Sequence, residues 1–424
     1  MGMMRRRDFL QLGALAALGG ISARAQARVK KSAAKARVVI AGGGFAGASC
    51  ALHLRHLNPA LEVVLIDPDE SYVTCPMSNE ALVGMRTLRS LTISRAGLAR
   101  AGVRYVRASV VGIDAVQRHV RLDDGSALDY DRLVVAPGIR FLWGTPGGYD
   151  AAAAQRMPHA WKAGAQTELL AAKLRSMPDG GVVAISVPSG LIRCPPGPYE
   201  RASLIAHYLK THKPRSKVLI FDANNHFPKQ DVFTAAWQEL YPGMIEWIAS
   251  TQDGAVVRID AKKNILYTSA AAHPVAVVNI IPPQAPGMLA LDAGLASGHG
   301  WCPIKPESFE SQLVDHVHVI GDACIADAMP KSASAAVSQA RQCALAIVTA
   351  LEGREPPAPA FDSVCYSLLA PGNALAIHGD FTIANGEIRQ VEAESSSSTN
   401  LPKATFARQA NDWYKNIVAQ SFGL

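Results

Sequence analysis

The sequence predicts an α/β protein of two or three domains, and three observations support this prediction. The chain has 424 residues, of which 49% are hydrophobic and 18% charged, so it can bury a large core. A strand rich in β-branched residues, a glycine turn and a helix follow one another over residues 36–57. Further short apolar strands end in small or acidic residues near positions 67, 136 and 321. Disordered and collagen-like chains are excluded by the same composition.

The first 27 residues are predicted to be an export signal. A basic start is followed by an apolar run of about a dozen residues and then by small residues. That run is shorter than the ~20 residues that span a bilayer. Arg6 and Arg7 place it close to the twin-arginine signals, with cleavage after Ala25 or Ala27. Removing residues 1–27 takes away four arginines and one aspartate, so the formal charge falls from +7 to +4. We therefore expect a periplasmic protein, exported by the twin-arginine pathway, that is not an integral membrane protein.

The first motif of the mature chain indicates a dinucleotide-binding site. Gly42, Gly44 and Gly47 follow the spacing GxGxxG between a strand and a helix, and the next strand, at 61–68, ends in Asp67. The glycines allow a tight turn and the close approach of a pyrophosphate to the helix N-terminus, while the carboxylate accepts from a ribose hydroxyl. The alternative is a structural turn that binds no nucleotide.

Two later motifs favour FAD over NAD at this site. One apolar strand runs into Ala136 and Gly138, and the strand Val317–Ile320 runs into Gly321 and Asp322. The first is similar to the second dinucleotide-contact segment of flavoproteins with two dinucleotide-binding domains. The second is similar to the segment of those flavoproteins whose aspartate contacts the ribityl and phosphate part of FAD.

The segment between these motifs predicts a second domain without a working NAD site. A strand at 180–188 begins it as in a pyridine-nucleotide reductase, but the following residues, 189–200, contain two consecutive prolines and no GxGxxG. The CxxxxC motif of NADH-dependent disulfide reductases is also absent. We therefore expect a fold like that of glutathione reductase with a small C-terminal domain. The expected domains are the FAD-binding domain at 34–146 and 285–356, the NAD-domain-like domain at 147–284, and a C-terminal interface domain at 357–424.

Across nearly the whole mature chain, the sequence resembles the flavoprotein subunit of flavocytochrome c sulfide dehydrogenase. The stretches that carry the resemblance are VVIAGGGFAGA, YVTCPMSNE, MPHAWKAGAQT, RCPPGPYERAS, WCPI, HVIGDACIADAMPKSASAA, CYSLLAP and WYKNIVAQSFG. Several of them are specific to this subfamily. Sulfide:quinone oxidoreductases share the fold, but lack the export signal and the YxTC context in this form.

The resemblance implies roles for four residues. Cys75 matches the cysteine that carries FAD through an 8α-thioether, the alternative being a buried structural cysteine. Cys194 and Cys365 match a redox-active disulfide beside the flavin, which could instead be a structural crosslink. Glu200 matches an acid proposed as a proton acceptor, and its alternative role is an ion pair with Arg201 or a solvated position at a helix start.

The remaining cysteines have simpler expected roles. Cys50 and Cys343 lie in apolar helical stretches and are predicted to be core residues, whereas Cys302 and Cys324 lie in motifs expected near the flavin. Lys331 is predicted to be a cofactor-binding residue, because it precedes a helix whose N-terminus could face the flavin; the alternative is that this helix simply packs in the core. Because no CxxC and no zinc-ligand spacing occurs, no metal site is expected.

The expected function is periplasmic oxidation of sulfide. Hydrosulfide attacks the disulfide, sulfur leaves as zero-valent sulfur or polysulfide, and electrons pass through covalent FAD to haem. The sequence has no CxxCH, so a separate c-type cytochrome subunit is expected as partner. The alternatives are a sulfide:quinone oxidoreductase and a non-catalytic flavoprotein that serves another sulfur-oxidising enzyme. With only 6% aromatic residues, no nucleic-acid partner is expected.

Overall fold

The computed structural model describes residues 35–296, 300–391 and 403–424. The predicted export signal and the serine-rich stretch near residue 396 lie outside the described residues. Everything below concerns the compact unit that begins at Arg37.

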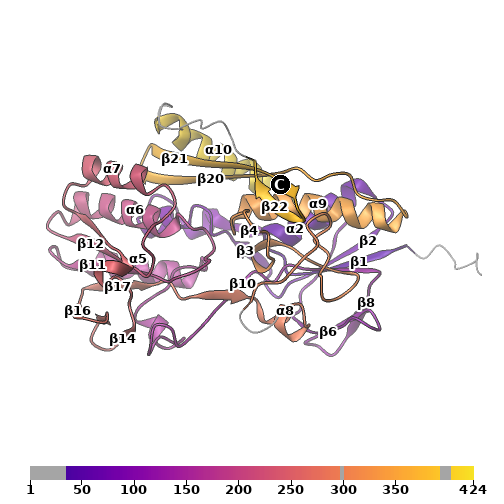
Figure 1. Ribbon diagram of the computed structural model, residues 1–424, viewed down its shortest axis with the longest axis horizontal. Coiled ribbons are helices and arrows are strands. Elements are labelled where there is room, and N and C mark those ends of the chain that lie inside the picture. Colours follow the sequence, from indigo (N-terminus) through magenta and orange to yellow (C-terminus); the bar gives the residue numbers. More distant parts are fainter. Residues whose placement is uncertain (1–34, 297–299, 392–402) are drawn as a thin grey trace, which may run out of the picture. The chain divides into compact units, whose positions relative to one another are not determined.

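The first layer is a five-stranded parallel sheet with the strand order β19-β9-β1-β2-β5. Its strands are short and largely buried, as expected for a parallel sheet covered on both faces. Helices α2 and α9 lie side by side over it (Figure 1). The elements are β1 Arg37–Ala41, α2 Phe45–Leu57, β2 Glu62–Ile66, β5 Arg104–Val106, β9 Arg132–Val135, β19 Val317–Val319 and α9 Ala333–Leu351.

Smaller elements surround this sheet. An antiparallel sheet of β6, β7 and β8 lies between β5 and β9 in the sequence, and β3 pairs with β4. These elements are β3 Ser71–Val73, α3 Ser78–Leu82, β4 Thr92–Ser94, α4 Ala96–Arg100, β6 Val110–Asp114, β7 His119–Leu122, β8 Ala127–Asp129 and α8 Met288–Asp292.

A second parallel sheet has the same pattern of strand pairing as the first. Four parallel strands have the order β13-β12-β11-β17, and β11 pairs with β12 and β17 as β1 pairs with β2 and β9. The elements are α5 Ala165–Ser176, β11 Val182–Val187, α6 Gly197–His212, β12 Lys217–Asp222, α7 Gln230–Leu240, β13 Ile245–Ile248, β14 Arg258–Asp260, β15 Ile265–Tyr267, β16 Ala272–Pro274 and β17 Val277–Ile280. Strands β10 Ile139–Phe141 and β18 Gln284–Pro286 pair antiparallel where the chain enters and leaves this layer.

The C-terminal region is a three-stranded antiparallel sheet with a helix packed on it. Its elements are β20 Phe361–Ala370, β21 Asn373–Ala384, β22 Glu387–Gln390 and α10 Lys403–Phe422. Helix α10 contacts β21 and α2 (Figure 1). Its buried residues recur at helical spacing, so one face is apolar. They are Phe406, Ala407, Ala410, Tyr414, Ile417, Val418, Ser421 and Phe422. The helix spans 20 residues, and its apolar face has a partner surface to pack on.

Candidate active site

One cavity of about 810 Å³ collects most of the predicted site residues. It opens at the carboxyl ends of the first sheet, where ligands of open parallel sheets bind. Eleven of the thirteen residues predicted to be catalytic or to bind the cofactor line it. They are Gly42, Gly44, Asp67, Cys75, Ala136, Gly138, Cys194, Glu200, Gly321, Asp322 and Cys365.

The glycine turn brings the backbone to the floor of this cavity. A Cβ on Gly42, which has a φ of +106°, would lie 2.3 Å from the carbonyl oxygen of Ala136. A Cβ on Gly47 would lie 1.9 Å from the carbonyl oxygen of Gly42, so Gly47 serves helix packing and does not itself line the cavity. Gly44 precedes α2 without a side-chain cap, which leaves the first N–H groups of the helix available to an anion.

Asp67 lies at the rim of the cavity and is already engaged. Its Oδ2 accepts a hydrogen bond from the backbone N–H of Gly43 at 2.6 Å, and its Oδ1 pairs with the buried guanidinium of Arg95 at 3.1 Å. Arg95 also donates to the carbonyl of Gly43. These contacts fix the carboxylate beside the glycine turn, the position at which a dinucleotide fold holds a ribose.

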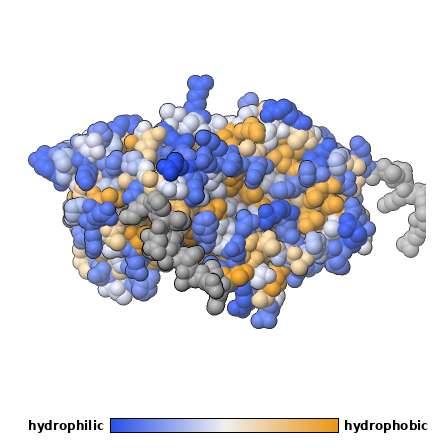
Figure 2. Space-filling view, turned by 90° about the horizontal axis from the view of Figure 1, so that it is seen from above, coloured by the Kyte–Doolittle hydropathy of each residue, from blue (hydrophilic) through white to orange (hydrophobic). Residues whose placement is uncertain are grey.

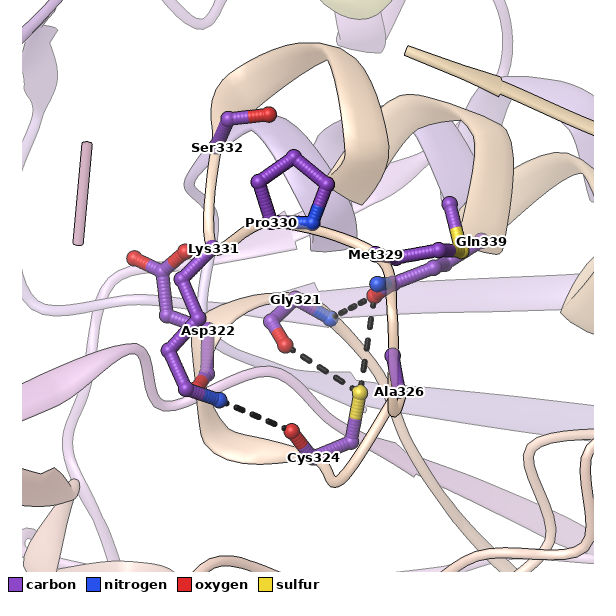
Figure 3. Close-up of a pocket in the computed structure, with 9 residues that line it drawn as sticks. All are labelled: Gly321, Asp322, Cys324, Ala326, Met329, Pro330, Lys331, Ser332 and Gln339. Carbon is purple, nitrogen blue, oxygen red and sulfur yellow. Dashed lines mark hydrogen bonds between the residues drawn. The ribbon is translucent and has the colours of Figure 1, made fainter. Parts of the chain in front are cut away.

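Lys331 lies differently from the expectation. Its Nζ donates to the carbonyl oxygens of Asp322 at 2.8 Å and Cys324 at 2.9 Å, and stands 3.7 Å from the ring centre of Trp301. Figure 3 shows this ammonium pointing at the Cys324 carbonyl in a small pocket, which shares Gly321, Asp322 and Ser332 with the lining of the large cavity. The loop carbonyls that replace its hydration shell hold it there. Lys331 therefore braces the loop that carries Asp322, and its side chain does not line the cofactor cavity.

Cys75 lines the cavity just after β3. Its Sγ is 3.9 Å from the carbonyl oxygen of Trp161, which also accepts from the guanidinium of Arg193. The segment is anchored by the buried Thr74, whose hydroxyl hydrogen-bonds the hydroxyl of Tyr414 at 2.8 Å. The half-buried thiol faces the cavity, which is compatible with attachment to a group bound there.

Cys194 is held in an uncommon backbone conformation. Its φ of +55° lies in the left-handed region, and its N–H donates to the carbonyl of Lys331 at 2.8 Å. Non-glycine residues in this region cost about 1 kcal/mol and cluster at functional sites. The strain turns Cys194 into the cavity just before α6 begins at Gly197.

Cys365 reaches the same cavity from β20, opposite Ile377 of β21. Both Cys194 and Cys365 are free thiols in this structure. Burial raises the pKa of Cys194, and the neighbouring Cys365 and Glu200 raise it further. Burial also raises the pKa of Cys365, against hydrogen bonds with Ser332 and Ser363 that lower it. The two cysteines are thus neighbours, and their bonding as a disulfide stays a prediction.

Glu200 is a carboxyl group that titrates near neutrality. Its Oε1 accepts from the N–H of Leu368 at 3.0 Å and its Oε2 from the side-chain amide of Asn79 at 2.9 Å. Burial raises its pKa to about 7, although both hydrogen bonds favour the charged form. Within the described residues no ion pair joins Glu200 to Arg201, so the alternative role weighed for Glu200 is not observed. A carboxyl with this pKa can exchange a proton at physiological pH.

The other four cysteines form two buried pairs. Cys50 and Cys343 are fully buried, and a hydrogen bond between their thiols joins α2 to α9. Cys302 and Cys324 lie opposite each other in a parallel bridge, and burial raises the pKa of each to about 12. Neither pair lines the large cavity. All four are therefore buried, packed thiols.

The corresponding edge of the second sheet is filled by side chains. Asp222 ends β12, as Asp67 follows β2, but it is fully buried and accepts from the hydroxyl of Tyr199 at 2.6 Å and from Trp247 at 2.9 Å. Tyr199 stacks on Phe227 at 3.7 Å between ring centres. These rings pack against the end of β12, and the absence of an NAD site from the second domain stays a prediction.

The residues present fit FAD. The cavity combines a close-approach glycine turn, an uncapped helix N-terminus, a carboxylate at the ribose position and backbone segments from Ala136 and Gly321. A dinucleotide needs these features at its pyrophosphate and ribose. The lining also includes residues that sequence reasoning did not single out, notably Asn79, Trp161, Lys162, Arg201 and Trp413. Most of them stand within the stretches YVTCPMSNE, MPHAWKAGAQT and RCPPGPYERAS. The sequence could therefore have indicated that these residues lie near the site, but it does not indicate what each one does.

Three family models match the chain. Residues 167–282 match the model described as sulfide dehydrogenase [flavocytochrome c] flavoprotein chain, central, and residues 357–422 match flavocytochrome c sulphide dehydrogenase, flavin-binding. Residues 36–170 match the pyridine nucleotide-disulphide oxidoreductase model. The predicted α/β fold of this oxidoreductase type is confirmed by the last match and by the solved structures below.

Individual proteins similar to this chain are sulfide-oxidising flavoproteins or oxidoreductases by name. The flavoprotein chain of sulfide dehydrogenase [flavocytochrome c] from Chlorobaculum thiosulfatiphilum is 56% identical over 43 residues, which are 10% of this chain and 90% of that one. The mitochondrial sulfide:quinone oxidoreductase of Dictyostelium discoideum is 23% identical over 316 residues, covering 72% of this chain and 68% of that one. The crystal structure of the sulfide:quinone oxidoreductase from Aquifex aeolicus has a TM-score of 0.69 at 18% identity and covers 92% of both chains. The putidaredoxin reductase–putidaredoxin complex has a TM-score of 0.62 at 20% identity, with 92% and 99% covered.

Proposed function

Because the chain belongs to the family of flavocytochrome c sulfide dehydrogenase flavoprotein chains, we propose that it oxidises sulfide and passes the electrons to a c-type cytochrome. The observation that carries this proposal is the convergence of Cys194, Cys365 and Glu200 on the cavity that fits FAD. Two sulfurs and a carboxyl of near-neutral pKa are the groups that a reaction of hydrosulfide with a disulfide requires.

FAD would be held by the glycine turn, Asp67 and the backbone at Ala136, Gly138 and Gly321. When bound, it supplies an acceptor for two electrons that can be released one at a time. We further propose that Cys75 carries it covalently, because its half-buried sulfur faces the cavity.

The sulfur chemistry balances between the two cysteines. Hydrosulfide attacks one sulfur of a Cys194–Cys365 disulfide, forming a new S–S bond as a persulfide and releasing the other sulfur as a thiolate. Overall, one hydrosulfide yields zero-valent sulfur, one proton and two electrons. A second hydrosulfide removes the outer sulfur of the persulfide as polysulfide and leaves a second thiolate. Oxidation of the two thiolates back to the disulfide releases two electrons, for which bound FAD would supply the acceptor.

Glu200 takes the proton. Its carboxylate form exists above a pKa of about 7, and Leu368 and Asn79 hold both oxygens in place. Glu200 stands in the first turn of α6, three residues after Gly197, whose Cβ position would be 3.0 Å from the Cys194 sulfur. The proton released from hydrosulfide therefore has a nearby acceptor.

The electron acceptor is proposed to be a cytochrome for two reasons. The matched family consists of the flavoprotein chains of flavocytochromes, and this sequence contains no CxxCH with which to hold its own haem. The apolar face of α10 is buried against the chain's own β21 and α2 and so is not displayed for a membrane. None of the helices in the described part of the chain could cross a bilayer, and hydrophobic and hydrophilic residues are mixed on the face in Figure 2. We propose the periplasm as the location, from the sequence of residues 1–27.

Acid precipitation followed by sulfide titration tests this function. The purified holoprotein should give a yellow pellet in acid, and sulfide should bleach its flavin absorbance under anaerobic conditions. Reduced protein should then reduce a c-type cytochrome faster than a soluble quinone. Cys194→Ser should abolish bleaching, whereas the buried control Cys343→Ala should keep it. A colourless pellet would refute attachment to Cys75, and a flavin that sulfide leaves oxidised would refute the reaction itself.

A further inference from the structure

Arg201 is a buried guanidinium in the wall of the cavity. Only 2% of its surface is exposed, yet it lines the cavity beside Cys194. Its Nε donates to the amide oxygen of Asn79 at 3.0 Å, and its Nη1 donates to the carbonyl of His159 at 3.1 Å and to the amide oxygen of Asn279 at 2.8 Å. Its Nη2 donates to the carbonyl of Ala160 at 2.7 Å.

All four acceptors are neutral oxygens. Two other arginines here have carboxylate partners. Arg193, which also lines the cavity, pairs with Asp322 at 3.8 Å, and Arg95 pairs with the lining residue Asp67 at 3.1 Å. No carboxylate pairs with Arg201 within the residues that the structure describes. Of the two arginines that line the cavity, Arg193 therefore has a carboxylate partner and Arg201 has none.

An unpaired cation is costly to bury, because low-dielectric surroundings cannot replace water around it. Burial lowers the pKa of Arg201 to about 10, so the group still carries its proton at neutral pH. The ionisable groups that favour its charged form are Cys194, Glu200 and Cys75, all in the cavity lining. The charge is therefore complementary to an anion formed or bound in the cavity.

We propose that Arg201 is the fixed cation that stabilises sulfur anions at Cys194. These anions are the thiolate, the persulfide and an approaching hydrosulfide. Its four hydrogen bonds hold the guanidinium in one place, so no reorganisation is needed when negative charge develops on sulfur. The hydrosulfide and persulfide parts rest on the proposed function, whereas the thiolate part does not depend on it.

Asn79 positions this cation with respect to the proton acceptor. Its amide oxygen accepts from Arg201 and its amide nitrogen donates to Glu200 at 2.9 Å and to the carbonyl of Gly197 at 3.3 Å. One amide thus separates the guanidinium from the carboxylate. If Arg201 and Glu200 paired directly, the guanidinium would stabilise the Glu200 carboxylate instead of a sulfur anion.

The groups that face Cys194 come from several elements and define the test. They are Cys365 from β20, Glu200 from α6, Arg193 from the preceding loop and Cys75, together with Arg201. All except Arg201 remain unchanged in Arg201→Gln and Arg201→Lys, so a shift between these two variants reports the charge at position 201.

The test is the pH dependence of Cys194 alkylation in the holoprotein. After reduction with dithiothreitol and its removal, the protein reacts with iodoacetamide at pH 5.5–10, and mass spectrometry of the Cys194 peptide gives the rate. Since only the thiolate reacts, the midpoint of the rate profile measures thiol ionisation. Arg201→Gln should move the midpoint up by at least about one pH unit, a tenfold slower reaction below it. Arg201→Lys, which keeps the charge, should stay within about half a unit, as should the exposed control Arg215→Gln.

An unchanged midpoint in Arg201→Gln would overturn the proposal, and so would equal shifts in Arg201→Gln and Arg201→Lys. If Arg201→Gln does not fold, Asn79→Asp replaces it, because the new carboxylate would pair with Arg201 and cancel its charge. That variant should also shift the midpoint upward, and a wild-type midpoint there would count against the proposal. No sulfide is used, so a failed sulfide titration and a failed alkylation test are separate results.

Discussion

The two parallel sheets of this protein have a similar strand arrangement, but they differ at their carboxyl ends, where the first has a large cavity and the second is filled by side chains. In the first, β1 passes through a three-glycine turn into α2, and Asp67 stands at the rim of a large cavity. In the second, β11 passes through residues 188–196 into α6, and Asp222 is sealed beneath Tyr199. One edge is open for a ligand, whereas the other is closed by aromatic side chains.

The difference shows how a nucleotide turn can be put to another use. The longer loop before α6 carries Arg193 and Cys194, and both side chains line the cavity of the first sheet. The helix that would cradle a pyrophosphate instead presents Glu200 and Arg201 to the same cavity. In the proposed function, the region of the second sheet thus provides the sulfur chemistry for the cavity of the first, and substitutions at equivalent places in the two regions should have unequal effects.

The largest difference is expected between two glycines. In Gly47→Ala, the new Cβ would lie 1.9 Å from a backbone oxygen that cannot move freely, so we expect a loss of at least about 4 kcal/mol in the free energy of unfolding and loss of bound FAD. Gly190→Ala, in the loop of the second region, has a φ of +84° but open space around its Cβ, so it should cost about 1 kcal/mol. Urea unfolding and the flavin-to-protein absorbance ratio measure both. Equal losses would break the comparison.

The filled edge is tested by Tyr199→Ala. Removing this buried ring, which stacks on Phe227, should cost about 3–4 kcal/mol of unfolding free energy. Flavin content should stay near the wild-type value, because the ring does not line the cavity. NADH should leave the flavin oxidised in this variant as in the wild type. Flavin reduction by NADH would show that the second edge retains a nucleotide site.

Glu200→Gln separates proton transfer from binding. The carboxylate accepts protons only above its pKa of about 7, so the wild-type rate of flavin reduction by sulfide should fall as the pH drops below 7. The variant should be slower by about 100-fold at pH 8 and should lose the part of the pH dependence due to this group. Stopped-flow traces at pH 6–9 give both values. A variant with the wild-type rate would remove Glu200 from the mechanism.

Glu200→Gln should lower the rate of flavin reduction but raise the stability of the folded state at high pH. The raised pKa means that the folded state holds this proton more tightly than the unfolded state. Wild-type stability therefore falls as the pH rises from about 4.5 to 7, through the range between the unfolded and folded pKa values. Glu200→Gln should have a higher Tm than the wild type at pH 8 and a similar Tm at pH 4. A Tm that is lower at pH 8 would contradict the buried, near-neutral carboxyl.

The smallest effect is expected at a buried thiol. Cys302→Ala removes a fully buried sulfur that does not line the cavity, so it should cost about 1 kcal/mol and leave sulfide-dependent bleaching unchanged. Thermal unfolding and the sulfide titration of the holoprotein provide the comparison. Loss of bleaching would place Cys302 among the reactive cysteines.

Much of this architecture could be predicted from the sequence, because its signals are local. The turn at Gly42 and the helix Ala333–Leu351 follow from spacing and periodicity, and the structure has both. The roles of Lys331 and Arg201 could not be predicted, since each depends on residues distant in the sequence. Lys331 donates hydrogen bonds to loop carbonyls beside Trp301, and Arg201 donates to the side-chain oxygens of Asn79 and Asn279. Only the folded chain shows that Arg193 pairs with a carboxylate and that Arg201 has no carboxylate partner among the described residues.

The cavity wall has a consequence for the order in which the protein matures. Its lining begins at Ala41 and includes Tyr366 and Trp413 from the C-terminal region. Synthesis proceeds from the N-terminus, so a nascent chain of 360 residues already has the glycine turn but cannot yet enclose a cofactor. At that stage the cavity would lack the part of its wall that Cys365, Tyr366 and Trp413 supply. The cavity is therefore complete only after β20 and α10 have been made, which ties its final shape to the last part of the chain to be synthesised.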